Sequence, residues 1–112
     1  MQALSPELQA YAERVEEVAS EFETDAYTWE GDIPWGNLQL LADEGLYCPS
    51  IDEAYGGGGM SDLASVVLTE AVSRACPDTG WFMYTQSMVG PRAIDLFGSE
   101  SVKEAYLPGV TA

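Results

Sequence analysis

Histidine is absent from the sequence, lysine occurs once and cysteine twice among 112 residues. Without histidine, the chain cannot form a Ser–His–Asp triad or a histidine-ligated metal site from its own residues. Cys48 and Cys76 are far apart and have no further thiol or imidazole ligands beside them, so a zinc site is not expected. Two unpaired thiols are typical of a reducing compartment.

Long apolar runs are also lacking. No stretch approaches the roughly 20 apolar residues that cross a bilayer. Residues 1–7 do not combine a basic segment with an apolar one, so we expect no secretory signal. Together with the free thiols, these absences predict a cytoplasmic protein without a membrane span.

Basic residues are scarce: four lysines and arginines oppose nineteen acids, for a formal net charge of −15. Phosphate contacts need lysine or arginine, so nucleic-acid binding is not expected, and an anionic membrane surface is disfavoured for the same reason. The acids extend from Glu7 to Glu104 and predict solvated outer faces. We hypothesise adaptation to a salt-rich cytoplasm that screens the repulsion; equal stability at low and molar salt would contradict this.

The apolar residues that are present, 46% of the chain, predict one globular domain with a modest core. Near the N-terminus they recur at spacings of three and four, which predicts a helix that reaches about Glu23. Its apolar stripe consists of Leu4, Leu8, Tyr11, Val15, Val18 and Phe22. Tyr27 and Trp29 are expected to anchor the next loop on the core.

A second helix is predicted over about 34–44, because proline is accepted in the first turn of a helix. Gly45 suits the left-handed position that ends a helix. Leu46 would then fold back on Leu41 as in a Schellman motif.

A third helix is predicted over about 61–75, with Ser61 as its N-cap. Apolar residues cover most of its circumference, so we expect it to be buried on nearly all sides. No stretch alternates between apolar and polar residues over a useful length, so strands are not expected. The fold class predicted for residues 1–112 is all-α, an orthogonal or up-down bundle of five to six helices.

The C-terminal third contains further helical stretches. Asp78 or Thr79 is expected to cap a fourth helix, which Gly-Pro at 90–91 would kink or restart. Ser99 is expected to cap a last short helix that ends at Leu-Pro, residues 107–108.

Four consecutive glycines, 56–59, separate the second helix from the third. Glycine adopts φ > 0 and allows other backbone to approach closely, so the run has two interpretations. It is either a flexible hinge between two helical pairs, the usual meaning of clustered glycines, or a turn that is specific to one protein family, and the residues on both sides decide between the two.

Three motifs follow one another along the chain. They are the helix exit Glu44-Gly45-Leu46, then Pro49 with Tyr55-Gly56-Gly57, then Gly98-Ser99-Glu100, Lys103-Glu104 and Tyr106-Leu107-Pro108. In this order they resemble the N-terminal helical domain of acyl-CoA dehydrogenases, with its Glu-Gly-Leu-like exit, Pro-x-x-Tyr-Gly-Gly loop and Gly-Ser/Thr-x-x-x-Lys-x-x-Tyr-Leu-Pro ending. The loop departs from that pattern, since five residues separate Pro49 from Tyr55. Each motif alone is weak evidence, but together they cover nearly the whole chain.

The resemblance implies one domain of a flavoenzyme. Acyl-CoA dehydrogenases are similar three-part proteins, with a middle β-domain and a C-terminal helical domain after the N-terminal helices. FAD lies between those later domains, and in most members the catalytic carboxylate comes from the C-terminal part. The resemblance thus implies that residues 1–112 lack the catalytic base and most of the flavin site, and that FAD and acyl-CoA bind only with the other domains.

In that family, the helix before the Gly-Ser/Thr ending supplies one wall of the acyl pocket. By position this helix spans 81–89, and the resemblance implies the wall residues Trp81, Phe82, Thr85, Met88 and Val89. Trp81, Thr85 and Met88 share a helical face, and an aromatic wall suits an apolar acyl chain. Ordinary core packing explains the same stripe and is its more common meaning. The basic residues are too scattered for a CoA phosphate site, and Arg92 is interpreted as an ion-pair partner.

Three hypotheses remain open. The chain is the N-terminal piece of a flavin-dependent acyl-CoA dehydrogenase, or a stand-alone acidic helical interaction module derived from that family, or a generic acidic bundle with accidental motifs. A coding segment that resumes the family pattern after Ala112 would favour the first, and a bundle without the glycine-loop geometry would favour the third. An uncovered apolar face would promote self-association in salt, or pairing with the remaining dehydrogenase domains.

Overall fold

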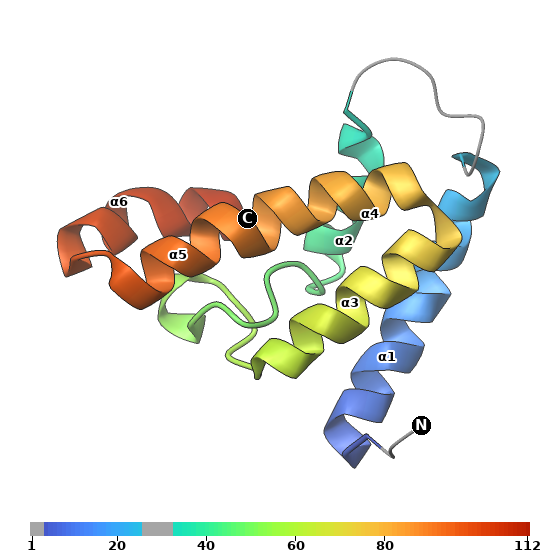
Figure 1. Cartoon of the computed structure of the whole chain (residues 1–112), viewed down its shortest axis with the longest axis horizontal. Helices are drawn as coiled ribbons and strands as arrows, with labels where there is room; N and C mark the ends of the chain where they lie inside the picture. The colour runs from blue at the N-terminus through green and yellow to red at the C-terminus, as the bar shows by residue number, and fades with distance from the viewer. Residues whose placement is uncertain (1–3, 26–32) are drawn as a thin grey trace.

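The computed structural model describes residues 4–25 and 33–112, and all regular structure in these ranges is helical (Figure 1). The α-helices are α1 Pro6–Ala19, α2 Trp35–Asp43, α3 Asp62–Ala75, α4 Pro77–Tyr84, α5 Gly90–Phe97 and α6 Glu100–Thr111. Two 3₁₀ segments, η1 Ser20–Asp25 and η2 Glu53–Tyr55, and one π-helical segment, η3 Thr85–Val89, complete them. The predicted all-α bundle of five to six helices is confirmed.

The helices form two packed pairs, α1 with α3 and α5 with α6 (Figure 1). A long helical rod made of α4, η3 and α5 connects the two pairs. α1 lies along α3, and α3 turns at Cys76 into α4. α4, η3 and α5 follow one another without a break, so residues 77–97 form a continuous helical path. α6 folds back beside α5, and α2 contacts α4.

Of the two outcomes predicted for Gly-Pro at 90–91, a restart of the helix is therefore wrong, because the helical path continues through Pro91 with the π-helical segment directly before it. In an α-helix the proline ring clashes with the carbonyl four residues earlier, and a π-helical turn bonds five residues back instead. The hydroxyl of Ser87 donates to the Met83 carbonyl at 2.8 Å, and that of Thr85 donates to the Phe82 carbonyl at 2.9 Å. These side-chain bonds satisfy carbonyls at the start of the irregular turn.

The main core joins α1, η1, α2, α3 and α4. Its fully buried members include Val15, Phe22, Leu41, Leu68 and Met83. The predicted apolar stripe of the first helix is confirmed at its C-terminal half, and Ser5 caps that helix with Oγ accepting from the Leu8 amide at 3.3 Å. Tyr27 and Trp29, expected to anchor the next loop, lie outside the described residues.

A second, smaller core cluster holds α6 to the loop after α2. It consists of the buried side chains of Cys48, Ile51 and Leu107. Tyr47 packs against both clusters and connects them. Burial raises the pKa of the Cys48 thiol to about 12, so this cysteine stays protonated and behaves as an apolar core residue.

The end of α2 is a Schellman motif, as predicted. Gly45 has φ of 72°, its amide donates to the Ala42 carbonyl at 3.0 Å, and the Leu46 amide donates to the Leu41 carbonyl at 2.9 Å. Leu41 and Leu46 are both buried in the main core. The glycine thus supplies the backbone conformation that returns an apolar side chain to the core.

Three sequence expectations about the helices are wrong. α3 is not buried on nearly all sides, since Leu63 is 46% and Val66 56% exposed; α1 and α4 cover its other faces. α4 begins at Pro77 in the first turn, and is not capped by Asp78 or Thr79. α6 passes through Pro108 to Thr111, whose hydroxyl donates to the Tyr55 carbonyl at 2.6 Å and so holds the last turn in place.

No helix among the described residues is long and apolar enough to cross a membrane.

Candidate functional site

The four glycines form a tight turn that folds back on the loop after α2. Amides of residues 58–60 donate to carbonyls of residues 48–51 at 2.8–3.1 Å. Gly56 and Gly59 have φ of 92° and 64°, conformations that side chains with a Cβ rarely adopt. A Cβ on Gly57 would collide with the backbone of Ile51. The glycines are therefore a hydrogen-bonded turn and not a hinge.

This turn is connected to the C-terminal helices by polar side chains. Arg92 on α5 lies 3.0 Å from Asp62 at the start of α3 and 2.7 Å from Asp95, and points toward the Ser50 carbonyl at 3.4 Å. The interpretation of Arg92 as an ion-pair partner is confirmed. Because Arg92 is only 28% exposed, this network holds α3, α5 and the loop in one arrangement.

Tyr55 makes a second connection, from the turn to α6. Its hydroxyl donates to the Glu100 carboxylate at 2.6 Å. This hydrogen bond, with smaller contributions from burial and nearby acids, raises the pKa of Tyr55 to about 12, and the same bond lowers the pKa of Glu100. The pair therefore stabilises the fold most between the ordinary pKa of glutamate and that of tyrosine; the contribution is lost as Glu100 protonates in acid, and as Tyr55 ionises near pH 12.

We expect Glu100→Gln to lower the pKa of Tyr55 from about 12 toward the ordinary value of about 10, because the charged acceptor is removed. An NMR titration of the Tyr55 ring carbons measures this pKa. Glu104→Gln is the matched control, since Glu104 acts on Tyr55 only through its charge and should change the pKa much less. An unchanged Tyr55 pKa in Glu100→Gln would contradict the pairing.

The long helical rod has two opposite sides, and α3 covers one of them incompletely. Two shallow hollows of about 300 and 380 Å³ lie between α3 and α4, and both are lined by Thr69, Ser73 and Tyr84. Trp81 is 64% exposed, and its ring centroid lies 6.3 Å from that of Tyr84. The sulfur of Met88 accepts from the Thr69 hydroxyl at 3.2 Å. These hollows form an apolar groove that we call the α3–α4 groove.

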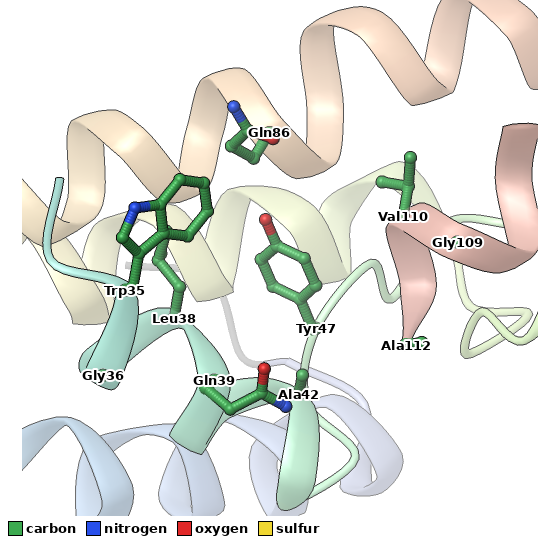
Figure 2. A pocket seen from close by; sticks show the side chains of 10 residues that line it. All are labelled: Trp35, Gly36, Leu38, Gln39, Ala42, Tyr47, Gln86, Gly109, Val110 and Ala112. Atoms are coloured by element: carbon green, nitrogen blue, oxygen red, sulfur yellow. The ribbon is translucent and has the colours of Figure 1, made fainter.

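The other side of the rod faces a larger cavity of about 480 Å³ between α2, η3 and the end of α6. Figure 2 shows the rings of Trp35 and Tyr47 directed toward the helix that carries Gln86, with Val110 across from Tyr47. Gln86 and Tyr84 are two positions apart on the helix and point to opposite sides, one to the cavity and one to the groove.

The sequence of this chain is similar to that of a known protein family. A family model described as the acyl-CoA dehydrogenase N-terminal domain matches residues 5–112, which is nearly the whole chain. The chain belongs to the acyl-CoA dehydrogenase family. The observed glycine turn and this match together exclude the interpretation of the three motifs as accidental.

Curated relatives of this acyl-CoA dehydrogenase domain carry several activities in their names. A probable medium-chain specific acyl-CoA dehydrogenase of Caenorhabditis briggsae is 33% identical over 86 residues, covering 73% of this chain and 20% of the relative. A cyclohex-1-ene-1-carbonyl-CoA dehydrogenase of Syntrophus aciditrophicus is 36% identical over 69 residues, 62% of this chain and 16% of the relative. A 3-sulfinopropanoyl-CoA desulfinase of Variovorax paradoxus is 31% identical over 68 residues, 61% of this chain and 17% of the relative.

The acyl-CoA dehydrogenase domain thus spans about a fifth or less of the length of these relatives. Their names share a CoA thioester and differ in the reaction. Membership in the family assigns the domain, and leaves the substrate and reaction to be proposed.

The five residues expected at an acyl-pocket wall do not share one surface of the domain. Trp81 and Met88 border the α3–α4 groove. Phe82 is half-buried and packs against the main core, while Thr85 is half-buried and bonded to the Phe82 carbonyl. Val89 is 52% exposed. The π-helical segment begins at Thr85, so the regular spacing used to group these residues does not continue through it.

Sequence reasoning missed Tyr84, which shares the α3–α4 groove with Trp81, and the cavity residues Trp35, Tyr47 and Gln86. The spacing of three residues between Trp81 and Tyr84 indicates that these two side chains lie on one face of the helix, so Tyr84 could have been predicted. The second set comes from three separate elements, and nothing in their local pattern indicates that they converge.

The described residues do not form a phosphate site. All four basic residues of the chain, Arg14, Arg74, Arg92 and Lys103, lie within 4.0 Å of carboxylates. A diphosphate group would have to displace these carboxylates and would meet a net charge of −15.

Proposed function

We propose that this domain is the N-terminal part of an FAD-dependent acyl-CoA dehydrogenase that removes hydrogen across the α,β bond of an acyl-CoA thioester. The observation that supports it most is the family match over residues 5–112, which includes the long helix and the glycine turn. Named relatives that act on medium-chain and cyclic acyl-CoA thioesters are consistent with this reaction class.

In this proposal the helix formed by α4 and η3 supplies one wall of the acyl pocket. Of the five residues Trp81, Phe82, Thr85, Met88 and Val89, we propose that Trp81, Met88 and Val89 contact the acyl chain and that Phe82 and Thr85 support this wall from the side of the core. Trp81 and Val89 carry large exposed apolar surface, and such surface excludes water from an acyl chain once another domain covers it. None of these residues is a catalytic acid or base, and we propose that the domain is inactive alone.

FAD would supply the oxidant in the complete enzyme. The paired arginines and lysine described above do not fit its diphosphate, so we propose that the other domains hold the flavin. The contribution of this chain is then to shape and dry the acyl pocket beside it.

Complementation tests this proposal. The purified chain is titrated with FAD alone, then mixed with separately produced remaining domains of the related medium-chain dehydrogenase. We expect no flavin retention alone, and flavin retention with acyl-CoA-dependent bleaching in the mixture. Flavin binding by the isolated chain would contradict the proposal. Absence of both signals in the mixture would favour a stand-alone interaction module instead.

A matched pair of variants tests the wall. Val89→Glu places a charge on the proposed wall and should slow the bleaching of the mixture by about tenfold or more, because a charge is costly in an apolar pocket. Val102→Glu makes the same change on α6, where Val102 is 37% exposed and does not belong to the proposed wall. Equal rates for the two variants would argue against the wall.

A further inference from the structure

Tyr84 lies at the boundary between the two hollows of the α3–α4 groove. The hollow of about 380 Å³ is lined by Trp81, near the corner where α3 turns into α4, and the hollow of about 300 Å³ is lined by Met88, farther along the rod. α3 and the rod diverge from that corner (Figure 1), so the hollows follow one another along the groove. Because Tyr84, Thr69 and Ser73 line both hollows, these three side chains form the passage between them.

Contacts in both hollows fix the width of the groove. In one hollow, the Thr69 hydroxyl of α3 donates to the Met88 sulfur at 3.2 Å. In the other, α3 and α4 approach so closely that a Cβ on Gly80 would collide with Ser73. Helices packed at this density do not move apart without losing contacts. Whether a ligand can extend from one hollow into the other therefore depends on the side chain of Tyr84.

The ring of Tyr84 is held in place by its neighbour Trp81. The two ring centroids lie 6.3 Å apart, and the ring planes are tilted by 34°. Aromatic pairs at such separations attract each other beyond the gain from buried area. Tyr84 is 37% exposed, but its ring leaves the groove only by giving up this contact. The ring therefore separates the two hollows.

The lining of both hollows suits a hydrocarbon chain. Among the described residues that line them, Glu70 alone is charged, and Arg74 donates to its carboxylate at 3.0 Å. An apolar chain that covers the remaining surface removes it from water, which favours binding. A ligand with a carboxylate at the end of its chain would be repelled by Glu70. The groove thus favours an uncharged hydrocarbon group.

We infer that Tyr84 limits the acyl group of the substrate to a short, uncharged chain that fills one hollow. A chain that extends along the groove from either hollow reaches the Tyr84 ring, so methylene groups beyond that point stay in water and add no affinity. This inference rests on the proposed function, which places the acyl chain against Trp81 and Met88. It adds Tyr84 as a residue that determines specificity, and α3 as the facing wall of the pocket.

Neutral thioesters test this with the 112-residue protein, labelled with ¹⁵N and with ¹³C in its methionine methyl groups. S-butanoyl-N-acetylcysteamine and S-octanoyl-N-acetylcysteamine differ only in the length of the acyl chain. We expect both to shift the Met88 methyl or Trp81 indole signal in a saturable manner, with dissociation constants within about threefold of each other. In Tyr84→Ala the octanoyl thioester should bind at least about tenfold more tightly than the butanoyl thioester, because each further buried methylene strengthens binding by about fourfold.

Two control variants separate the ring of Tyr84 from general effects. Tyr84→Phe keeps the ring and should show the same ratio of affinities as the parent protein. Tyr106→Ala removes a ring that is 61% exposed on α6 and lines neither hollow, so the ratio should again be that of the parent. Because the readout is a ratio of two affinities within one variant, a uniform loss of stability does not change it.

Each contrary result is informative. A parent protein that binds the octanoyl thioester about tenfold more tightly than the butanoyl thioester overturns the limit on chain length. An unchanged ratio in Tyr84→Ala overturns the role of Tyr84, and the absence of a saturable shift with either thioester overturns the groove as the acyl site. These titrations need no flavin and no other domain. If they succeed while the complementation experiment fails, the groove remains an acyl site and only the proposed reaction is lost.

Discussion

Leu68→Ala is expected to lower the free energy of unfolding by about 2–5 kcal/mol, the usual cost of removing a buried leucine side chain and leaving a cavity. Leu68 lies in the middle of α3, is fully buried and packs in the main core with residues of α1 and α4. Urea unfolding followed by circular dichroism measures the change. Because small domains are stable by only about 5–15 kcal/mol, this one substitution should remove a large part of the total.

The control is two residues away on the same helix. Val66 is 56% exposed on the side of α3 that faces solvent, and Val66→Ala should change the free energy of unfolding by less than about 0.5 kcal/mol. Both variants replace an aliphatic side chain by alanine in a helix interior. Similar losses from the two would mean that α3 is covered on both sides in solution, for example by a second copy of the chain.

Gly57→Ala is the second large effect that we expect, with a loss of about 1–3 kcal/mol from overpacking. The φ of Gly57 is not in the left-handed region, so its role is close approach: an added Cβ would collide with the Ile51 carbonyl and with the Ile51 side chain. The turn has little freedom to move apart, since hydrogen bonds of 2.8–3.1 Å join residues 58–60 to residues 48–51.

Gly36→Ala is the matched substitution without the collision. Gly36 lies in the first turn of α2, and an added Cβ would meet nothing within 4 Å. This variant should be neutral or more stable by about 0.4–1 kcal/mol, since alanine restricts the unfolded chain more than glycine does. Thermal unfolding of both variants decides between the two interpretations of the glycines: a flexible hinge would tolerate alanine at either position.

Local sequence patterns predicted some elements of the fold well, because these elements depend on short-range interactions. The stripe in α1, the glycine exit of α2 and the Ser99 cap of α6 depend on neighbours within one or two turns. In each case the preference of the side chain and the demand of the backbone agree, so one sequence was enough to place the element.

Predictions failed where a distant segment determined the outcome. The last turn of α6 continues past Pro108 because Thr111 bonds to the Tyr55 carbonyl and Val110 packs beside the smaller core cluster. Residues near positions 85–91 keep a helical path because a π-helical segment accommodates Pro91. Neither stabilising arrangement is visible in the local sequence around these prolines.

The candidate site shows the same limit. The helix that contains residues 81–89 was identified from its place relative to the Gly-Ser motif, and the family match is consistent with that placement. Which of its side chains share a surface was not predictable from spacing, because the π-helical segment changes the angle between successive residues after Tyr84. Phe82 and Tyr84 lie in α4 before this segment, on the core and on the α3–α4 groove, whereas Gln86 lies within the segment and borders the cavity on the other side.

The sequence by itself determined the class of this protein: an acidic, all-helical domain whose ordered motifs identify the acyl-CoA dehydrogenase family. Such features depend on composition and on short-range backbone preferences, and both can be recognised from a single sequence. Only the tertiary structure decided that the glycines form a hydrogen-bonded turn, that α3 leaves one face open, and that Trp35, Tyr47 and Gln86 line one cavity. These outcomes come from contacts between residues far apart in the chain, for which no local preference exists.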